Sequence, residues 1–233
     1  MTTQTDAHIP SATLSDSPFS VLENAQFERL ESLTRHIRRP SGSILYEEGE
    51  AAVECYFALE GVVEVFKRTE QGGSFILKTA RPGEFFGLDD VIASDGVYQS
   101  SARITAEADL VGIPREEMTN LLESSPAFAA EILSLVADHA CSLRGRLTSF
   151  VEKPVSARLI ETLDHLARFH GTANGEGVRI QLSITNQKLA EMVGSTPETV
   201  STLLRDLKNE HIIDRKGQTF VIRQPERLRE HSY

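Results

Sequence analysis

The sequence predicts an α+β protein: an N-terminal antiparallel, jelly-roll-like β-roll, then one long helix, then a small helical domain that includes a β-hairpin. Three observations predict this order. Between residues 41 and 114, short apolar segments alternate with glycines at regular intervals, as they do in antiparallel β-domains. From residue 129, apolar residues recur in steps of three and four, the period of a helix. Towards the C-terminus, two short helical segments meet at a glycine and precede paired strand-like segments.

Composition limits the class of protein. The chain has 233 residues, is 40% hydrophobic and 25% charged, and contains no apolar run near the roughly 20 residues of a membrane helix. Residues 1–18 are polar and lack the layout of a secretory signal, so we expect a disordered tail on a cytoplasmic protein with no membrane partner. Two cysteines, Cys55 and Cys141, are too few for a four-thiolate cluster, which argues against an iron–sulfur centre, and we expect both to be small buried apolar residues.

Charge is distributed unevenly along the chain. From Glu152 onward there are 12 Lys and Arg against 11 Asp and Glu, a balance of +1, whereas the preceding part has 12 against 23, a balance of −11. Phosphate contact depends on local charge and not on the total of −10. The charge balance is therefore compatible with a nucleic-acid partner for the C-terminal part, but not for the acidic N-terminal part.

The N-terminal domain is predicted over residues 19–125. Helical spacing over residues 19–39 stops at Pro40, so we expect a helix there. The following segments between glycines are predicted as short separate strands, the clearest of them residues 55–59, 62–66 and 75–77.

The long helix is predicted over residues 126–152. It carries a heptad seam, and the simplest partner for such a seam is the same helix of a second copy, which predicts a homodimer. The seam residues are Leu133, Val136, Ala140, Leu143, Leu147 and Phe150. The alternative is a helix that only covers the β-domain, a role we assign to the neighbouring stripe of Phe128, Ile132 and Leu135.

Residues 153–233 form the predicted C-terminal domain. Pro154 should begin a helix that runs to about His170, and residues 172–177 should form a loop before a strand at 178–182. Thr185 then caps a first helix that Gly194 ends, and Thr196 caps a second helix. The second helix has Pro197 at its first position and a buried stripe of Val200, Leu203, Leu204 and Leu207. With a β-hairpin wing over residues 212–222, this is a winged helix-turn-helix.

The chemistry of the second helix fits DNA recognition. Its N-terminus would enter a major groove, where Glu198 accepts a hydrogen bond from a cytosine amine. Candidates for base contact are Glu198, Ser201 and Thr202. Candidates for phosphate contact are Thr185, Gln187, Thr196, Thr199 and Arg205. The alternative is a helical hairpin of another domain, in which Glu198 only complements the helix dipole.

These motifs resemble the cyclic-AMP receptor protein/FNR superfamily of bacterial regulators along nearly all of the chain after residue 18. The resemblance rests on Arg81-Pro82-Gly83-Glu84-Phe85-Phe86-Gly87, the long helix, and residues 194–207, within which Glu198-Thr199-Val200-Ser201 looks like the family's recognition helix. It implies a homodimer that binds a pseudo-palindromic site in double-stranded DNA and contacts RNA polymerase, often as an activator. It also implies that Glu198 faces a C·G pair in each half-site.

Departures from the family pattern bear on the effector. Members that bind cyclic AMP carry a Glu after the β-roll glycine and an Arg about ten residues later; here Leu88 follows Gly87 and Tyr98 falls near the Arg position. Asp89-Asp90 adds negative charge where a phosphate would lie, so cyclic AMP is not expected. The expected effector pocket consists of Phe86, Gly87, Leu88, Tyr98 and Ser100. Arg103, the nearby cation, is expected to be a strand surface charge.

Other signals stay open. Pro197 and Thr202 stand where many family members have arginines, so the DNA site should differ from the commonest ones or be recognised less strictly. The seven histidines show no spacing typical of a ligand set, and haem is left open. We predict no metal ligands. Cys141 adjoins the seam, and its oxidation would alter dimer packing if it is redox-active.

Two other functional classes compete with a DNA-binding regulator. One is a sensor or interaction module whose helix-turn-helix binds protein, which would lack the steep salt dependence of DNA binding. The other is an enzyme. The sequence contains no nucleophile elbow or phosphate-binding loop, and the acidic pairs Glu47-Glu48 and Asp89-Asp90 are typical of solvated surface, so we predict no enzyme.

Overall fold

A computed structural model describes residues 17–69 and 73–230, and it divides the chain into two compact units, Met1–Ser142 and Leu143–Tyr233. The predicted tail, residues 1–18, lies outside the described residues as far as residue 16. Its last two residues were predicted wrongly, because Ser17 is buried and Pro18 begins the 3-10 helix η1 (Pro18–Val21).

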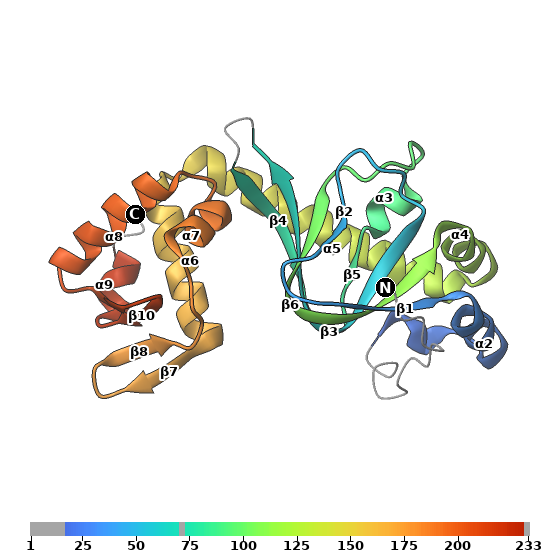
Figure 1. The fold of residues 1–233 in the computed structure, drawn as a ribbon, viewed down its shortest axis with the longest axis horizontal. Coiled ribbons are helices and arrows are strands. Elements are labelled where there is room, and N and C mark those ends of the chain that lie inside the picture. Colours follow the sequence, from blue (N-terminus) through green and yellow to red (C-terminus); the bar gives the residue numbers. More distant parts are fainter. Residues whose placement is uncertain (1–16, 70–72, 231–233) are drawn as a thin grey trace. The chain divides into compact units, whose positions relative to one another are not determined.

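The first unit is built on one antiparallel sheet (Figure 1). Its strands are β1 (Arg35–Arg39), β2 (Ile44–Tyr46), β3 (Glu54–Arg68), β4 (Ser74–Ala80), β5 (Phe85–Phe86) and β6 (Ser101–Pro114). The order is β1-β6-β3-β4, with β2 paired to β6 and β5 paired to β3. The predicted antiparallel β-domain is thus confirmed, and the long strands β3 and β6 form its centre.

The predicted helix over residues 19–39 is wrong in its second half. Helix α2 (Asn24–Leu33) ends at Leu33, and residues 35–39 form β1. The residues of β1 pair with β6, Ile37 opposite Leu110, which turns Ile37 into the core. Pairing with a strand about 70 residues later outweighs a local helical period that only Ile37 continued.

The segments 55–59 and 62–66 belong to one strand, β3, and not to two. Gly61 has φ +85°, and a Cβ placed on it would lie 2.3 Å from the carbonyl oxygen of Glu107. The register between β3 and β6 shifts on both sides of this glycine. Gly61 therefore bends the strand through a bulge and does not end it.

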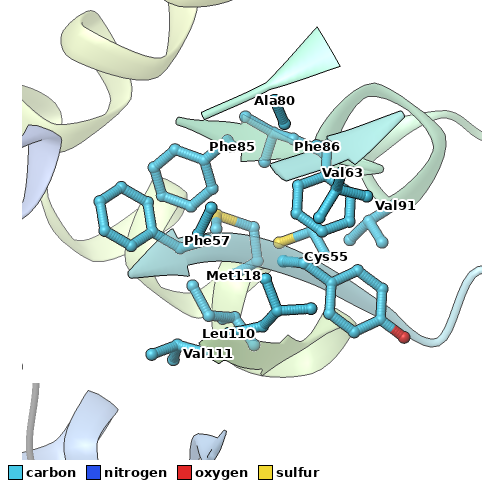
Figure 2. Close-up of a cluster of buried hydrophobic side chains, with 14 of the residues drawn as sticks. Cys55, Phe57, Val63, Ala80, Phe85, Phe86, Val91, Leu110, Val111 and Met118 are labelled. Carbon is cyan, nitrogen blue, oxygen red and sulfur yellow. The ribbon is translucent and has the colours of Figure 1, made fainter. Parts of the chain in front are cut away.

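The core of the first unit lies between the central strands and the helices that cover them. Figure 2 shows Phe57 of β3, Leu110 of β6 and Met118 of α4 (Arg115–Ser124) packed together. The helix α5 (Pro126–Glu152) adds Phe128 and Ile132 to this core, as predicted. Leu135 does not join them, since it is 39% exposed.

The second unit combines helices with a four-stranded sheet of order β7-β8-β10-β9 (Figure 1). Its elements after α5 are α6 (Val155–His170), β7 (Gly171–Asn174), β8 (Gly177–Ile180), α7 (Asn186–Val193), α8 (Pro197–Asn209), β9 (Ile213–Lys216), β10 (Thr219–Ile222) and α9 (Pro225–Glu230). The helix after Pro154 and the wing β9–β10 are confirmed. The expected loop at 172–177 is wrong in part, because β7 pairs with β8 as a hairpin.

A continuous apolar core joins α6 to the helices and sheet of the second unit. Leu159, Leu163, Ile180 and Phe220 are fully buried within it. No helix in the described ranges combines the length and apolarity needed to span a membrane.

Candidate nucleic-acid interface and effector region

Helix α7 begins and ends as its sequence predicts. The Thr185 hydroxyl accepts a hydrogen bond from the amide of Lys188 at 3.1 Å, which satisfies one of the unpaired donors of the first turn. Gly194 ends the helix with φ +63°, the left-handed conformation that glycine adopts without strain. This turn fixes the direction in which the chain enters α8.

Helix α8 begins with a second cap. The Thr196 hydroxyl accepts from the amide of Thr199 at 3.3 Å, and Pro197 occupies the first position, where no amide donor is needed. Val200, Leu204 and Leu207 are buried on one side of the helix, while Leu203 is half-buried. The opposite side is therefore free to face solvent.

That exposed side of α8 presents the predicted base contacts. Glu198, Ser201, Thr202 and Arg205 are all exposed and follow one another at helical spacing. Neither Glu198 nor Arg205 has a side-chain hydrogen bond or ion pair with any residue in the described part of the chain. A carboxylate in the first turn of a helix interacts favourably with the helix dipole, which stabilises Glu198 at the start of α8.

The predicted phosphate contacts surround the two helix starts. Thr185, Gln187, Thr196 and Thr199 are exposed. Gln187 donates from Nε2 to Oε1 of Glu191 at 3.3 Å, and the hydroxyls of Thr196 and Thr199 lie 3.1 Å apart. Two capped helix starts with exposed hydroxyls form the type of surface that binds phosphate oxygens. The individual contacts remain predictions.

Two arginines that sequence reasoning missed hold the two ends of α7. Arg215 of β9 donates to Oδ1 of Asn186 and to the carbonyl oxygen of Ile184 beside the first turn, and its guanidinium lies 4.8 Å from the centre of the Phe220 ring. Arg158 of α6 donates to the carbonyl oxygens at the other end, as described below. Every residue carries a backbone carbonyl oxygen, so the acceptors of these hydrogen bonds cannot be recognised from sequence, and no local signal could have identified either role.

Arg158 joins three segments of the second unit. It donates to the carbonyl oxygens of Lys153 at 2.7 Å, Val193 at 2.9 Å and Gly194 at 3.5 Å. Its guanidinium also lies 4.6 Å from the centre of the Phe150 ring. Partial burial lowers the pKa of Arg158 from its usual value, and the three carbonyl oxygens compensate for the lost water.

The predicted dimer seam is largely exposed on α5. Leu133 is 70% exposed and Leu147 is 64% exposed; Ala140 and Leu143 are exposed as well. Val136 instead packs partly on the core of the first unit, and Phe150 lies beneath Arg158. Sequence reasoning missed Val151, which is 79% exposed and follows Leu147 by one helical turn.

The expected effector residues Phe86, Gly87, Leu88, Tyr98 and Ser100 are all buried. Tyr98 stacks on Tyr46 with ring centroids 3.8 Å apart and an interplanar angle of 10°. A Cβ placed on Gly87 would lie 3.3 Å from the Tyr98 ring and 3.4 Å from the Tyr46 hydroxyl. Two tyrosines therefore occupy the space directly against the β-roll glycine.

Sequence reasoning also missed the rest of this tyrosine cluster. Tyr56 stacks on Tyr46 at 5.8 Å and donates to Oε1 of Glu54 at 2.8 Å, while Tyr98 donates to the backbone carbonyl of Glu54. Arg35 of β1 pairs with the same Glu54 carboxylate. Burial raises the pKa of Tyr98 to about 12 and that of Tyr46 well above its usual range. Burial thus keeps the phenols of this cluster in their neutral form, and the buried Tyr46 hydroxyl has no hydrogen-bond partner among the described residues.

Asp90 and Arg103 correct two further expectations. Asp90 is buried beside this cluster and does not lie on solvated surface; burial raises its pKa to about 6, and its carboxylate accepts from the amide of Gln99 at 3.1 Å. Arg103 is not a simple surface charge, because it pairs with the buried Glu64 at 3.0 Å and lies over the Phe66 ring.

The remaining cofactor candidates show no gathered ligand set. Within residues 17–69 and 73–230, no group of three His, Cys, Asp or Glu side chains is arranged to hold a metal ion. His36 faces Asp109 at 3.4 Å, and His139 faces Asp89 at 3.9 Å. Cys55 is buried as expected, whereas the expectation of burial is wrong for Cys141, which is exposed on α5; redox activity of Cys141 stays an open hypothesis.

The two units together define a class of protein: a sensor-type β-roll joined by a long helix to a winged helix-turn-helix. Residues 37–125 match the profile of the cyclic nucleotide-binding domain, and residues 157–231 match that of the Crp-like helix-turn-helix domain. The chain belongs to the CRP/FNR family of transcription regulators, whose members are not enzymes.

Several known proteins are similar to this chain over most of its length. A CRP-like cAMP-activated global transcriptional regulator of Mycobacterium tuberculosis is 25% identical over 211 residues, which are 89% of this chain and 94% of that protein. The anaerobic regulatory protein of Bacillus subtilis is 23% identical over 88% of this chain and 87% of its own length. The solved structure of the c-di-GMP responsive global regulator CLP of Xanthomonas campestris has a TM-score of 0.76 at 19% identity, over 86% of this chain and 99% of that one.

Proposed function

We propose that this chain acts in the cytoplasm as a homodimeric regulator that binds a pseudo-palindromic DNA site through α8. The observation that carries the proposal is the exposed face of that helix, where Glu198, Ser201, Thr202 and Arg205 stand beside two capped helix starts. The Glu198 carboxylate, which has no side-chain partner in the described part of the chain, is chemically suited to a cytosine amine.

The first test is selection of a randomised duplex library by the purified protein at physiological salt. We expect a palindrome with a C·G pair at the Glu198 position, and we expect binding to weaken steeply as salt rises. Recovery of no sequence above non-specific binding, with or without added haem, nitric oxide or nucleotides, would favour the alternative in which the helix-turn-helix binds a protein.

The dimer proposal depends on α5. Several exposed leucines on one helix are costly in water and favour burial against a second copy. Leu147→Glu should convert the dimer to a monomer in sedimentation velocity, because it buries a charge in the seam. Leu135→Glu is the matched control: Leu135 is also exposed on α5 but lies outside the seam, so its replacement should leave the dimer intact.

Control by cyclic AMP does not fit the effector region. The rings of Tyr98 and Tyr46 lie against Gly87, and Asp89 and Asp90 add negative charge in the first turn of α3 (Leu88–Ile92). We propose that the chain responds to an effector other than cyclic AMP or is active without a ligand. Cyclic AMP should therefore change neither the thermal unfolding nor the DNA affinity of the protein.

The resemblance makes RNA polymerase the expected protein partner and activation the expected effect. Transcription in vitro from a promoter that carries the selected palindrome tests both. An increase in transcript that Glu198→Ala removes supports activation, whereas a decrease would identify a repressor.

A further inference from the structure

Two helices of the second unit end with carbonyl groups that one side chain satisfies. The last carbonyl oxygens of a helix have no partner within it, and a cation near them is stabilising. Arg158 donates to Lys153, directly after α5, and to Val193 and Gly194 at the end of α7. Pro154 interrupts the backbone between α5 and α6, so it cannot supply an amide donor there.

The guanidinium suits this task because of its shape. It is planar and carries five N–H donors in a fixed fork, so it can satisfy two helix ends only while they keep one separation and orientation. The Phe150 ring, 4.6 Å from the guanidinium carbon, adds a flat contact on another side. Phe150 is itself the last residue of the predicted dimer seam.

We propose that Arg158 is a positioning residue, which ties the seam end of α5 to the turn that aims α8. A shift of the seam at Phe150 then changes the geometry at Gly194, three residues before α8 begins at Pro197. The statement about DNA rests on the proposed function, but the tie between Phe150 and the turn does not. Arg158 contacts no DNA in this assignment.

Amide hydrogen exchange tests the tie without DNA. The amides of Gly194 and Ser195 both donate to the carbonyl oxygen of Ala190, so their exchange reports the integrity of the turn. Arg158→Ala should raise exchange at both amides. Arg168→Ala is the matched control, because Arg168 lies on the same helix and pairs only with the side chain of Asp164 there. Equal exchange in the two variants would overturn the proposal.

DNA affinity tests the consequence, with the palindrome selected by the wild-type protein. Arg158→Ala should bind it about tenfold more weakly, Arg158→Lys should fall between the two, and Arg168→Ala should match the wild type. The salt slope of Arg158→Ala should equal that of the wild type. A slope smaller by about one would mean that Arg158 contacts a phosphate, which would overturn the positioning role.

A double-mutant cycle tests the link to the seam and covers the case in which Arg158→Ala fails to fold. Phe150→Leu keeps an apolar seam residue but removes the ring, and Arg158→Lys should then have little further effect on affinity. Independent, additive effects would overturn the link. If the wild-type protein itself selects no DNA, the proposed function fails, and exchange at Gly194 and Ser195 still decides the role of Arg158.

Discussion

The polar groups of the effector region in the first unit are buried, and we call this region the closed side. Those on the exposed face of α8 point to solvent, and we call this face the open side. In the β-roll, Tyr98, Tyr56 and Glu54 are buried and satisfy one another. On α8, Glu198 and Arg205 are exposed, and their side chains make no hydrogen bond or ion pair with the described residues. Closed networks of this type stabilise a fold, whereas exposed unpaired groups are available to a partner. The contrast suggests that specificity resides in the second unit and stability in the first.

The largest expected effect is on the closed side. Tyr98→Ala should lower the free energy of unfolding of the β-roll by about 3–4 kcal/mol, because it removes a buried ring and leaves a cavity. The measurement is tyrosine near-UV circular dichroism during guanidinium unfolding. It reports this unit, because the chain has no Trp and three of its four Tyr lie in the cluster.

A small phenol provides the control for that cavity. Millimolar p-cresol should restore part of the stability of Tyr98→Ala and leave the wild type unchanged, as expected for an apolar cavity of the right shape. Tyr98→Phe keeps the ring and loses the hydroxyl, with its hydrogen bonds to Glu54 and Tyr56, so it should cost about 1–2 kcal/mol. A Tyr98→Ala protein as stable as the wild type would show that the cluster is not closed.

On the open side, a substitution should instead reduce DNA affinity and leave stability almost unchanged. Glu198→Ala should reduce affinity for the selected palindrome by about 2–3 kcal/mol in the dimer, on the order of 100-fold, and relax the preference for C·G. Thermal unfolding should change little, because Glu198 loses only its interaction with the helix dipole and has no hydrogen bond or ion pair from its side chain within residues 17–69 and 73–230. Asp206→Ala, an exposed acid on the same helix, is the control for charge and should retain the preference.

Local patterns predicted the open side well. The caps at Thr185 and Thr196, the turn at Gly194 and the wing all depend on residues within a few positions of one another, and each was identified from sequence. Spacing alone also placed the polar residues of α8 on one exposed face. What spacing does not give is the DNA contact itself.

The contacts of the closed side could not be predicted, because most of them join residues that are far apart in the sequence. Glu54 joins Tyr56, its near neighbour on β3, to Arg35 of β1 and to Tyr98, and only the fold brings Arg35 and Tyr98 to it. The strand β1 was mistaken for helix for the same reason. Asp90 was assigned to the surface because an acidic pair gives no sign of burial.

The buried carboxyl group of Asp90 should make the stability of the closed side depend on pH. Burial raises its pKa from 3.8 to about 6, so the folded state prefers the protonated form; the contribution of Asp90 to stability is therefore greatest below about pH 4 and is lost as pH rises through 6. Asp90→Asn mimics the neutral form and keeps an acceptor for Gln99. It should stabilise the β-roll by about 1–2 kcal/mol at pH 7.5 and by almost nothing at pH 4.

The exposed neighbour Asp89 supplies the control for this pH effect. Asp89→Asn removes the same charge without changing a buried group, so its effect on the tyrosine signal should be small at both pH values. A gain from Asp90→Asn that is equal at pH 4 and pH 7.5 would mean that the Asp90 carboxylate is not the titrating group.

The smallest expected effect is at Thr196, which combines a structural role with a predicted role in DNA binding. Thr196 is exposed, yet its hydroxyl accepts from the amide of Thr199, so it serves the fold and is also a predicted phosphate contact. Thr196→Ala should lower the stability of the second unit by about 1 kcal/mol through the lost cap. Thr196→Ser keeps the hydroxyl and should restore both stability and affinity. If Thr196→Ala weakens DNA binding by more than its loss of stability while the salt slope is unchanged, the hydroxyl itself reaches the DNA, and even a capping residue belongs to the open side.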